Sequence, residues 1–524
     1  SFGSTKKIES TDDLIDKLRK DEAYRIDAKS YTKARLFDML IGDWDRHVDQ
    51  WRWAQFKQED GTKLFRPIPR DRDQAFSIMG DGALMGFATR AIPGLRLFEG
   101  FQEELRSVKG FNSSPKTFAL DMALLSETTL EDWEGQAEFL QQNLNDNVVE
   151  KAFEQFPEEV RDETVDDIKR IFLERKESLV EVAKEYYGIL NKYSVVTGTD
   201  KDDYFVITDT GKGKLDVKGY RIKGGKKADL FFDKEFTSEF NKEIWVYGLD
   251  DDDIFEVVGN LGKIKVRLIG GHNNDIYKIN EKARNIHVYD FKGKKNTYDE
   301  AFSGKLHKIN DYDTNTFQFL KVKASTNQFL PSIGFNPDDG FRLGFLNTYT
   351  FNGFRQNPFT QQHTINAAFY FATSGFDVGY SGEFANVFEK VNLELEARFT
   401  SPNFAINFFG FGNDTDNEDE INPLELDFNR VKMRQLHFSP SLVWRGFLGS
   451  KVKIGMRYEN FEVEETEDRF IEGFFTDSGR DPQQDFFGIT AGYEYSNSDN
   501  EAYPTMGMAI TLQGGYTMKL GDSE

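Results

Sequence analysis

Apolar and polar residues alternate along the last two-fifths of the chain, from about Asp313 onward. Between Lys390 and Thr400, apolar residues occupy every second position and charged or polar residues stand between them. A period of two predicts β-strands. About ten such segments follow one another, each near the length that crosses a bilayer at a tilt, with short turns and long polar loops such as Asn413–Asn422 and Glu464–Gln484 between them. This pattern predicts an antiparallel transmembrane β-barrel of the bacterial outer membrane over residues 313–524.

The first third of the chain has apolar residues at helical spacing instead. Ser10, followed by acidic residues, predicts the start of a helix, and Thr129 predicts the start of another. An apolar helix is predicted from Tyr31 to Ile41, and a long helical segment from Thr164 to Tyr193. These segments predict a helical domain over residues 1–193.

Residues 194–312 return to a period of two and contain a recurring acidic turn. The turns that begin at Gly198, Gly248 and Gly270 combine Gly, Asp or Asn with a following aromatic residue. Such turns between strands predict a small acidic β-rich domain, either a solenoid or a sandwich. They resemble the turns of repeats-in-toxin β-rolls, where carboxylates and carbonyls bind Ca²⁺. Acidic turns without Ca²⁺ are favoured over Ca²⁺ sites, because the spacing is irregular and tandem nonapeptides are missing.

Composition and charge exclude several functions. The net charge is -23, so the chain would repel a phosphate backbone and no nucleic-acid partner is expected. With 0 Cys there are neither disulfides nor thiolate metal sites. The mean hydropathy of -0.59 argues against helical membrane spans. The N-terminus has no basic-then-apolar export signal, so we expect that a signal was removed or that the chain is a downstream piece of a longer protein.

A hairpin motif near the C-terminus points to a known barrel family. The segment Tyr493–Gly507 contains Asp499, Asn500, Tyr503, Pro504, Thr505 and Gly507. It resembles the "DN…(F/Y)PT.G" hairpin of the BamA-like (bacterial surface antigen) superfamily, and Phe409–Asn413 is similar to the "F.G.GN" strand end of the same barrels. Pro and Gly make a tight turn, and Asp and Asn side chains accept hydrogen bonds from turn amides. The resemblance implies a barrel that anchors, inserts or translocates protein at the outer membrane.

The chain departs from this superfamily in one respect. Members carry an Arg-Gly-Phe loop inside the lumen, followed by several more strands. Here the segment Arg445–Phe447 precedes the hairpin and is expected to be an ordinary turn. An open barrel exposes backbone groups to lipid at a cost of several kcal/mol per group. We therefore expect an incomplete barrel, either a fragment or one whose closing strands come from another chain.

Two loops of the helical domain carry candidate chemistry. Gly42–Trp51 contains Asp-Arg-His, and Phe65–Phe76 contains an Asp-x-Asp pair. The two loops resemble the catalytic and metal-binding loops of phosphoinositide-kinase-like and spore-coat-type atypical kinases. Phosphoryl transfer needs mainly positioning and neutralisation of charge by a metal ion. The resemblance therefore implies a Mg²⁺-dependent phosphotransferase site in a domain similar to a kinase C-lobe.

The resemblance assigns a role to each candidate residue. Asp45 would orient or deprotonate the attacking hydroxyl, and His47 would shape the loop. Asp71 would bind Mg²⁺ with help from Asp73, and Gln50 occupies the position of the metal-binding Asn of those kinases. No glycine-rich phosphate loop and no matching Lys precede these loops.

A structural role is favoured over a working kinase site: Asp45, Arg46 and Asp71 are expected to form a buried salt-bridge network in a catalytically silent, kinase-like domain. The combination of both resemblances is similar to large outer-membrane proteins of the Bacteroidetes, in which a calcineurin-like phosphoesterase domain often precedes this region. None of that enzyme's signatures occurs here.

The sequence as a whole predicts a multidomain α + β protein of the Gram-negative outer membrane. Its helical and β-rich domains are expected in the periplasm, with membrane lipid and other outer-membrane or periplasmic proteins as partners. The leading function is to anchor, insert or translocate protein. The alternative is a membrane-tethered phosphotransferase or phosphoesterase whose catalytic site lies partly outside these residues.

Overall fold

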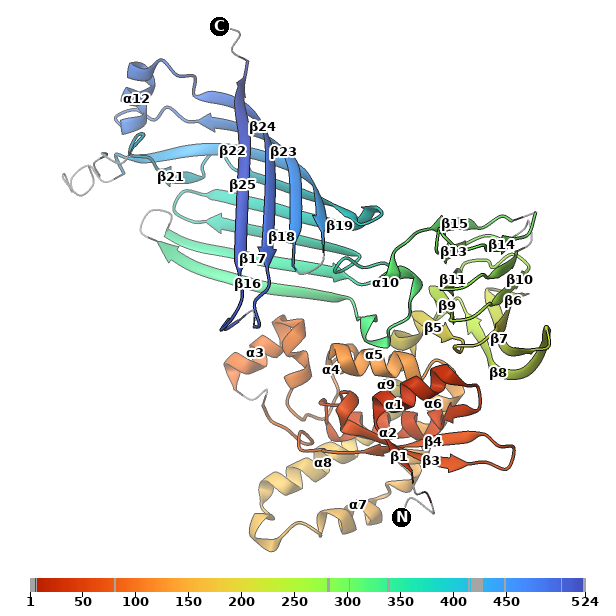
Figure 1. The fold of residues 1–524 in the computed structure, drawn as a ribbon. Helices are drawn as coiled ribbons and strands as arrows, with labels where there is room; N and C mark the ends of the chain where they lie inside the picture. The colour runs from red at the N-terminus through yellow and green to blue at the C-terminus, as the bar shows by residue number, and fades with distance from the viewer. Residues whose placement is uncertain are drawn as a thin grey trace. The chain divides into compact units, whose positions relative to one another are not determined.

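The computed structural model of the chain shows a mixed α and β protein (Figure 1). It describes residues 5, 7–79, 82–279, 283–300, 302–336, 340–412, 415, 427–446, 449–500 and 502–521. The chain forms two compact units. The helical–solenoid unit contains Ser1–Arg90 and Gly94–Ala324, and the sheet unit contains Ala91–Pro93 and Ser325–Glu524.

The first part of the helical–solenoid unit is mainly helical, as the sequence predicts. Its helices are α1 (Thr11–Lys20), α2 (Ala28–Ile41), α3 (Ala83–Ala91), α4 (Val108–Phe111), α5 (Pro115–Leu124), α6 (Leu130–Asn143), α7 (Asp146–Phe153), α8 (Glu163–Glu177) and α9 (Leu179–Asn191), with 3₁₀ turns η1 (Val48–Gln50), η2 (Pro93–Phe98) and η3 (Glu158–Val160). A four-stranded sheet in the order β1-β3-β4-β2 accompanies them, formed by Ile8–Glu9 (β1), Tyr24–Ile26 (β2), Trp51–Lys57 (β3) and Lys63–Pro69 (β4).

The structure confirms the predicted helix starts and the helical character of the segment Thr164–Tyr193. The Ser10 and Thr129 side chains cap α1 and α6 by accepting hydrogen bonds from backbone N–H groups three residues later. The helical segment predicted over Thr164–Tyr193 contains two helices, α8 and α9, because the backbone leaves the helical conformation at Ser178. Among the residues with described structure, no helix is both long and apolar enough to span a membrane.

The second part of the helical–solenoid unit is a β-solenoid, one of the two predicted possibilities. Its strands are β5 (Tyr193–Thr197), β6 (Asp203–Gly211), β7 (Lys214–Lys223), β8 (Lys226–Thr237), β9 (Glu243–Leu249), β10 (Ile254–Val258), β11 (Lys265–Gly271), β12 (Ile276–Ile279), β13 (Ile286–Asp290), β14 (Thr297–Tyr298) and β15 (Lys305–Lys308). From β9 onward successive strands alternate between two sheets, ordered β14-β12-β10-β6-β7-β8 and β15-β13-β11-β9-β5. Pairing between coils is parallel, and both sheets face one apolar core.

The acidic turns form two columns of Asx side chains along the solenoid. In the inner column, Asp253 Oδ1 accepts from the Asp203 N–H at 2.7 Å, and Asp275 Oδ1 accepts from the Asp253 N–H at 2.9 Å. Asn296 Oδ1 continues the column by accepting from the Asp275 N–H at 2.8 Å. The outer column runs in the opposite direction: the Asp252 N–H donates to Asp202 Oδ1 at 3.2 Å, and the Asn274 N–H donates to Asp252 Oδ1 at 3.0 Å. Each side chain therefore satisfies a backbone donor of an adjacent coil, the preceding coil in the inner column and the following coil in the outer column.

Glycine is required beside the inner column. A Cβ atom on Gly248 would lie 2.0 Å from Asp253 Oδ2 and 2.7 Å from the Gly270 carbonyl oxygen. The aromatic residue that follows each turn enters a continuous stack, in which the ring centroids of Phe205, Phe255, Tyr277 and Tyr298 are 5.2 to 5.4 Å apart. The repeated Gly, Asx and aromatic positions thus have one physical origin, the stacking of coils.

Burial of the inner column changes the acidity of its carboxyl groups. Loss of hydration raises the pKa of Asp203 to about 7 and the pKa of Asp275 to about 8, and it raises that of Asp253 well above its usual range. One carboxyl oxygen of each has no hydrogen-bond partner. Among the described residues no group of three or more His, Asp or Glu side chains can hold a metal ion, so Ca²⁺ at these turns stays a prediction.

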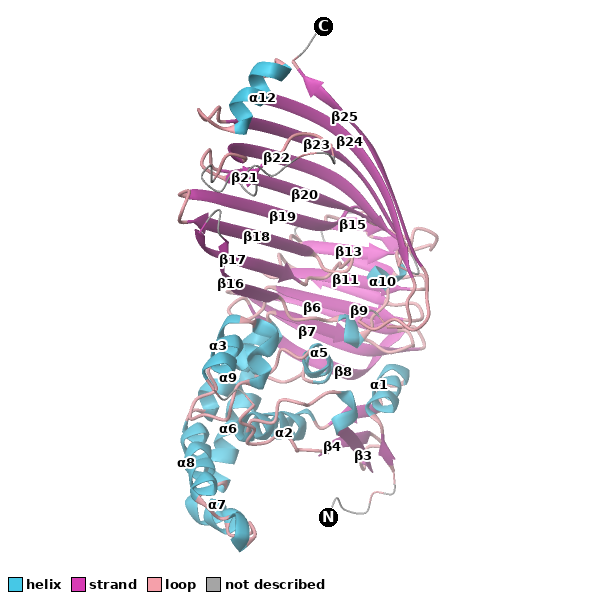
Figure 2. Cartoon of the chain, turned by 90° about the vertical axis from the view of Figure 1, so that its left-hand side faces the viewer, coloured by secondary structure: helices cyan, strands magenta, loops and turns pink. Residues whose placement is uncertain are grey.

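The sheet unit contains a ten-stranded antiparallel sheet (Figure 2). Its strands are β16 (Thr326–Asn336), β17 (Gly340–Phe351), β18 (Gln361–Tyr370), β19 (Gly375–Phe388), β20 (Val391–Thr400), β21 (Ala405–Asn407), β22 (Arg430–Arg445), β23 (Lys451–Val463), β24 (Gln483–Ser496) and β25 (Ala509–Leu520). They pair in chain order, except that short β21 pairs only with β22. Within the described part of the chain, β16 and β25 each have one neighbour, and no closed barrel forms.

Several predictions about the sheet unit are refined by the structure. Regular strands begin at Thr326 rather than near Asp313, because residues 312–321 form short helical turns, α10 (Tyr312–Asn315) and η4 (Phe319–Lys321). The loop after β23 contains a helix, α12 (Phe470–Ser478). Arg445 ends β22 and Gly446 donates its N–H to Ser450, which is turn geometry. Phe447, Asn413 and most of the predicted loop Asn413–Asn422 lie outside the described residues.

The hairpin between β24 and β25 has the turn chemistry that the sequence predicts. The Asp499 carboxylate accepts hydrogen bonds from the Thr505 hydroxyl and from the backbone N–H groups of Thr505 and Met506. These bonds, led by the one from the hydroxyl, lower the pKa of Asp499 to about 2. Gly507 has φ +147° and lies so close to Ser498 that a Cβ atom would be 2.6 Å from the Ser498 Cα.

Candidate functional site

The two candidate loops are held together by backbone hydrogen bonds. The first connects α2 to β3, and it begins at Gly42, whose φ of +74° ends the helix. The second follows β4. The Arg70 N–H donates to the Gln50 carbonyl at 2.9 Å, and the Phe76 N–H donates to the Ile41 carbonyl at 2.9 Å. The β3–β4 hairpin therefore brings the two predicted loops side by side.

Asp45 and His47, the predicted catalytic residues, lie together near the surface. Asp45 Oδ1 is 3.8 Å from His47 Nε2, and about a third of each side chain is exposed (34% and 33%). His47 Nδ1 accepts a hydrogen bond from the Asp49 N–H at 3.2 Å. That contact leaves Nε2 on the side of Asp45. The pair is accessible to a substrate, as a catalytic base must be.

The predicted metal ligands are only partly brought together. The Gln50 side chain donates to Asp71 Oδ2 at 3.5 Å, and the Asp71 backbone has φ +46°. Asp73 is exposed. Gln50 presents an N–H donor to Asp71 and does not act as an oxygen ligand in this conformation. Within the part of the chain that the structure describes, no group of three or more His, Asp or Glu side chains could hold a metal ion, so Mg²⁺ binding by Asp71 and Asp73 stays a prediction.

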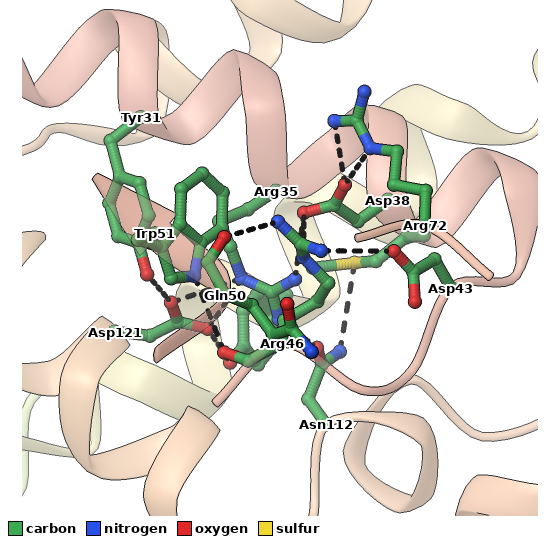
Figure 3. A network of polar contacts seen from close by, with 12 residues as sticks. Tyr31, Arg35, Asp38, Asp43, Arg46, Gln50, Trp51, Arg72, Asn112 and Asp121 are labelled. Carbon is green, nitrogen blue, oxygen red and sulfur yellow. Dashed lines mark hydrogen bonds and ion pairs between the residues drawn. The ribbon is translucent and has the colours of Figure 1, made fainter. Parts of the chain in front are cut away.

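A buried ionic network lies beneath the two loops, and the sequence analysis did not identify it as such (Figure 3). Its fully buried members come from α2, from the following loop and from α5, and they are Arg35, Asp38, Asp43, Arg46 and Asp121. Asp38 Oδ2 accepts from Arg46 Nε at 3.1 Å, and Asp38 Oδ1 accepts from Arg72 Nη2 at 2.8 Å. The predicted buried network of Asp45, Arg46 and Asp71 is therefore wrong in membership: only Arg46 is buried.

The other half of the network joins α2 to α5 and α9. Asp121 accepts hydrogen bonds from Arg35 Nε at 3.0 Å, from the Tyr31 hydroxyl at 2.7 Å and from the Tyr186 hydroxyl at 2.6 Å. Arg35 Nη2 also donates to Asn112 Oδ1 at 2.6 Å. These bonds compensate the loss of hydration of both charges, as buried ion pairs require.

Arg46 connects the network to both candidate loops. Its Nη1 donates to the backbone carbonyls of Arg70 at 2.7 Å and Asp71 at 3.0 Å, and its guanidinium lies 4.6 Å from the Trp51 ring centroid. The same Nη1 donates to Asp43 Oδ2 at 3.2 Å. Arg46 therefore positions the backbone that presents Asp71, while it does not itself reach the surface.

Asp43 is the most perturbed acid of this region. Burial raises its pKa to about 7, and Arg46 only partly opposes that effect. Its Oδ1 is buried without a hydrogen-bond partner. Because no part of Asp43 is exposed, it cannot act directly on a substrate. Asp43 precedes Asp45 by two residues, so its ionisation changes the electrostatic potential at Asp45.

Comparison of the sequence with known protein families and with curated proteins gives no match.

Proposed function

We propose that the sheet unit is part of a transmembrane β-barrel of the bacterial outer membrane, and that the protein anchors, inserts or translocates protein there. The observation that carries the proposal is one continuous apolar face on the sheet. Register places Leu442 opposite Ile454, Met456 opposite Ile489, and Tyr493 opposite Leu512 on this face.

This apolar face is accessible rather than packed against a core. Ile454 is 57% exposed, Leu512 is 64% exposed and Tyr516 is 69% exposed. Monomeric soluble proteins rarely expose contiguous apolar patches of more than a few hundred Å². A lipid-facing barrel surface, in contrast, consists of alternating outward apolar residues.

The opposite face of the sheet is polar and its charges are paired. Arg398 Nη2 lies 2.8 Å from Asp377 Oδ2, and Lys453 Nζ lies 3.0 Å from Glu396 Oε1. Arg445 and Glu383 form another pair on this face. A soluble β-sandwich turns its apolar face inward and its charged face toward solvent. A membrane barrel has the reverse arrangement, with the apolar face toward lipid and the charged face toward the lumen, and the two faces of this sheet match it.

A gel assay on the folded chain in detergent tests the membrane proposal. Outer-membrane barrels run faster when they are not heated before electrophoresis, so a faster band without heating is expected. Ile454→Arg, on the apolar face, should weaken that band, whereas Lys453→Gln, the adjacent residue on the polar face, should retain it. If neither protein gives a faster band, or both variants behave alike, the proposed orientation of the sheet is wrong.

The second candidate function is a membrane-tethered phosphotransferase or phosphoesterase, with the remainder of its catalytic site outside these residues. It is supported by one observation: the two loops place accessible Asp45 beside His47, and Asp71 beside Gln50. The test is binding of Mg²⁺ and ATP to the full chain by calorimetry, with Asp71→Ala as the variant and Asp60→Ala, in the β3–β4 turn, as the control. Mg²⁺-dependent binding lost only in Asp71→Ala supports this function, and absence of binding favours a catalytically silent scaffold.

A further inference from the structure

We propose that α3 rests on the surface of a bilayer that carries anionic lipid, which gives the helical–solenoid unit a membrane contact of its own. The segment that contains α3 projects from the candidate site. It leaves directly after the loop that presents Asp71, and its two ends are joined by a hydrogen bond from the Phe101 N–H to the Ser77 carbonyl at 2.8 Å. The rings of Phe76 and Phe101 pack edge to face below that bond, with centroids 5.1 Å apart.

The orientation of α3 is the reverse of that of an ordinary surface helix. Leu84 is 81% exposed and Phe87 is 54% exposed, whereas Thr89 is buried. Leu84 and Phe87 stand at positions i and i+3, which share one face of a helix. Ile78, before the helix, adds another large apolar side chain that is 65% exposed. The outward face is thus apolar where solvent normally requires polar residues.

The charge of this segment indicates what covers the apolar face. From Gly82 to Phe98 the chain contains Arg90 and Arg96 and neither Asp nor Glu, although the whole chain has a net charge of -23. Arg90 is exposed at the edge of the apolar face. An apolar helix face flanked by arginine is typical of helices that lie in the headgroup region, and anionic lipids attract such a helix. A bilayer surface therefore fits both the apolar and the charged part of the segment.

The absence of cysteine makes a direct test practical. The sequence has 0 Cys, so Leu84→Cys provides a single attachment point for a nitroxide label in the full chain. The label's accessibility to dissolved oxygen and to a water-soluble nickel chelate is measured after reconstitution into phosphatidylglycerol-containing vesicles. Val148→Cys is the matched aqueous control, because Val148 is an exposed apolar residue of α7. Leu512→Cys, on the proposed lipid-facing side of β25, reports separately on the sheet unit.

We expect the oxygen-to-nickel accessibility ratio at Leu84 to exceed that at Val148 several-fold and to fall in Arg90→Gln or in vesicles of phosphatidylcholine alone. A ratio at Leu84 equal to that at Val148 would overturn the inference. So would shielding from both reagents, which would mean that protein covers α3. A water-exposed label at Leu512 together with an immersed label at Leu84 would refute the proposed membrane sheet and leave the α3 contact standing.

Discussion

Replacing Asp275 by Asn should stabilise the β-solenoid at neutral and alkaline pH. Asp275 lies in the inner Asx column, and burial raises its pKa from 3.8 to about 8. Asn296 occupies the next place of the same column and makes the same hydrogen bond to a backbone N–H, so the geometry accepts an amide. The substitution removes the titrating group and retains the acceptor for the Asp253 N–H.

The size of the effect follows from the linkage between protonation and folding. Because the pKa of Asp275 is higher in the folded state, its contribution is most favourable below its ordinary pKa of 3.8 and is lost as the pH rises through the folded value of about 8. At about pH 7 the unfolded chain has released this proton and folding must take it up again. Three pH units at about 1.4 kcal/mol each make that cost about 4 kcal/mol. Asp275→Asn avoids it.

Hydrogen exchange of the backbone amides of β9 to β13 measures the stability of the solenoid itself. A local measurement is needed because a single unfolding free energy is not defined for a chain of two units. After correction for intrinsic exchange rates, protection in the native protein should fall as the pH rises from about 4 to about 8. Asp275→Asn should reduce that fall without abolishing it, because Asp203 and Asp253 still titrate in the variant. Asp252→Asn, in the exposed outer column, is the control, with an expected change below about 0.5 kcal/mol. A variant that is less protected at every pH, or equally pH-dependent, would refute the assignment of the titration to Asp275.

Three further substitutions test other parts of the structure. Gly248→Ala should lower the opening free energy of the solenoid, measured by hydrogen exchange, by about 2–4 kcal/mol, because its Cβ atom would lie 2.0 Å from Asp253 Oδ2. Gly293→Ala is the control and should be neutral, because its Cβ atom would have no heavy atom beyond its chain neighbours within 4 Å. Arg46→Met should destabilise the helical region by about 3–5 kcal/mol in chemical denaturation, since it removes the cation paired with buried Asp43 and one of the cations paired with buried Asp38. Arg52→Met, on a surface ion pair, should change stability by less than about 1 kcal/mol. Ile454→Arg should cost about 2–4 kcal/mol in urea unfolding from lipid vesicles, because a charge would face the hydrocarbon region.

The sequence predicts those features that depend on local chemistry. The turns at Gly248 and Gly270 are recognisable because one residue must lack a Cβ atom and the next ones must accept backbone N–H groups. The choice between solenoid and sandwich is not recognisable, because β6 pairs with β10 across the whole β7–β8 hairpin. Strand pairing at such separation leaves no local pattern.

In the candidate site, too, the local features can be predicted from the sequence and the long-range contacts cannot. The two loops are recognisable from their Asp-containing motifs, but the buried network beneath them joins Arg35 to Asp121, far apart in sequence. One local signal existed, since Arg35 and Asp38 are charged residues inside the apolar helix predicted over Tyr31–Ile41. A charge in such a helix indicates a buried partner, yet only the tertiary structure identifies that partner.

The paired columns of Asx and aromatic side chains make each solenoid coil an interchangeable module. A coil presents the same donors, acceptors and ring to its neighbours on either side, as Asp253 with Phe255 and Asp275 with Tyr277 do. Duplication or deletion of one coil would therefore change the length of this region by about 4.8 Å and leave the coils at its two ends intact. The length of the solenoid can therefore be changed in steps of one coil, by evolution or by design.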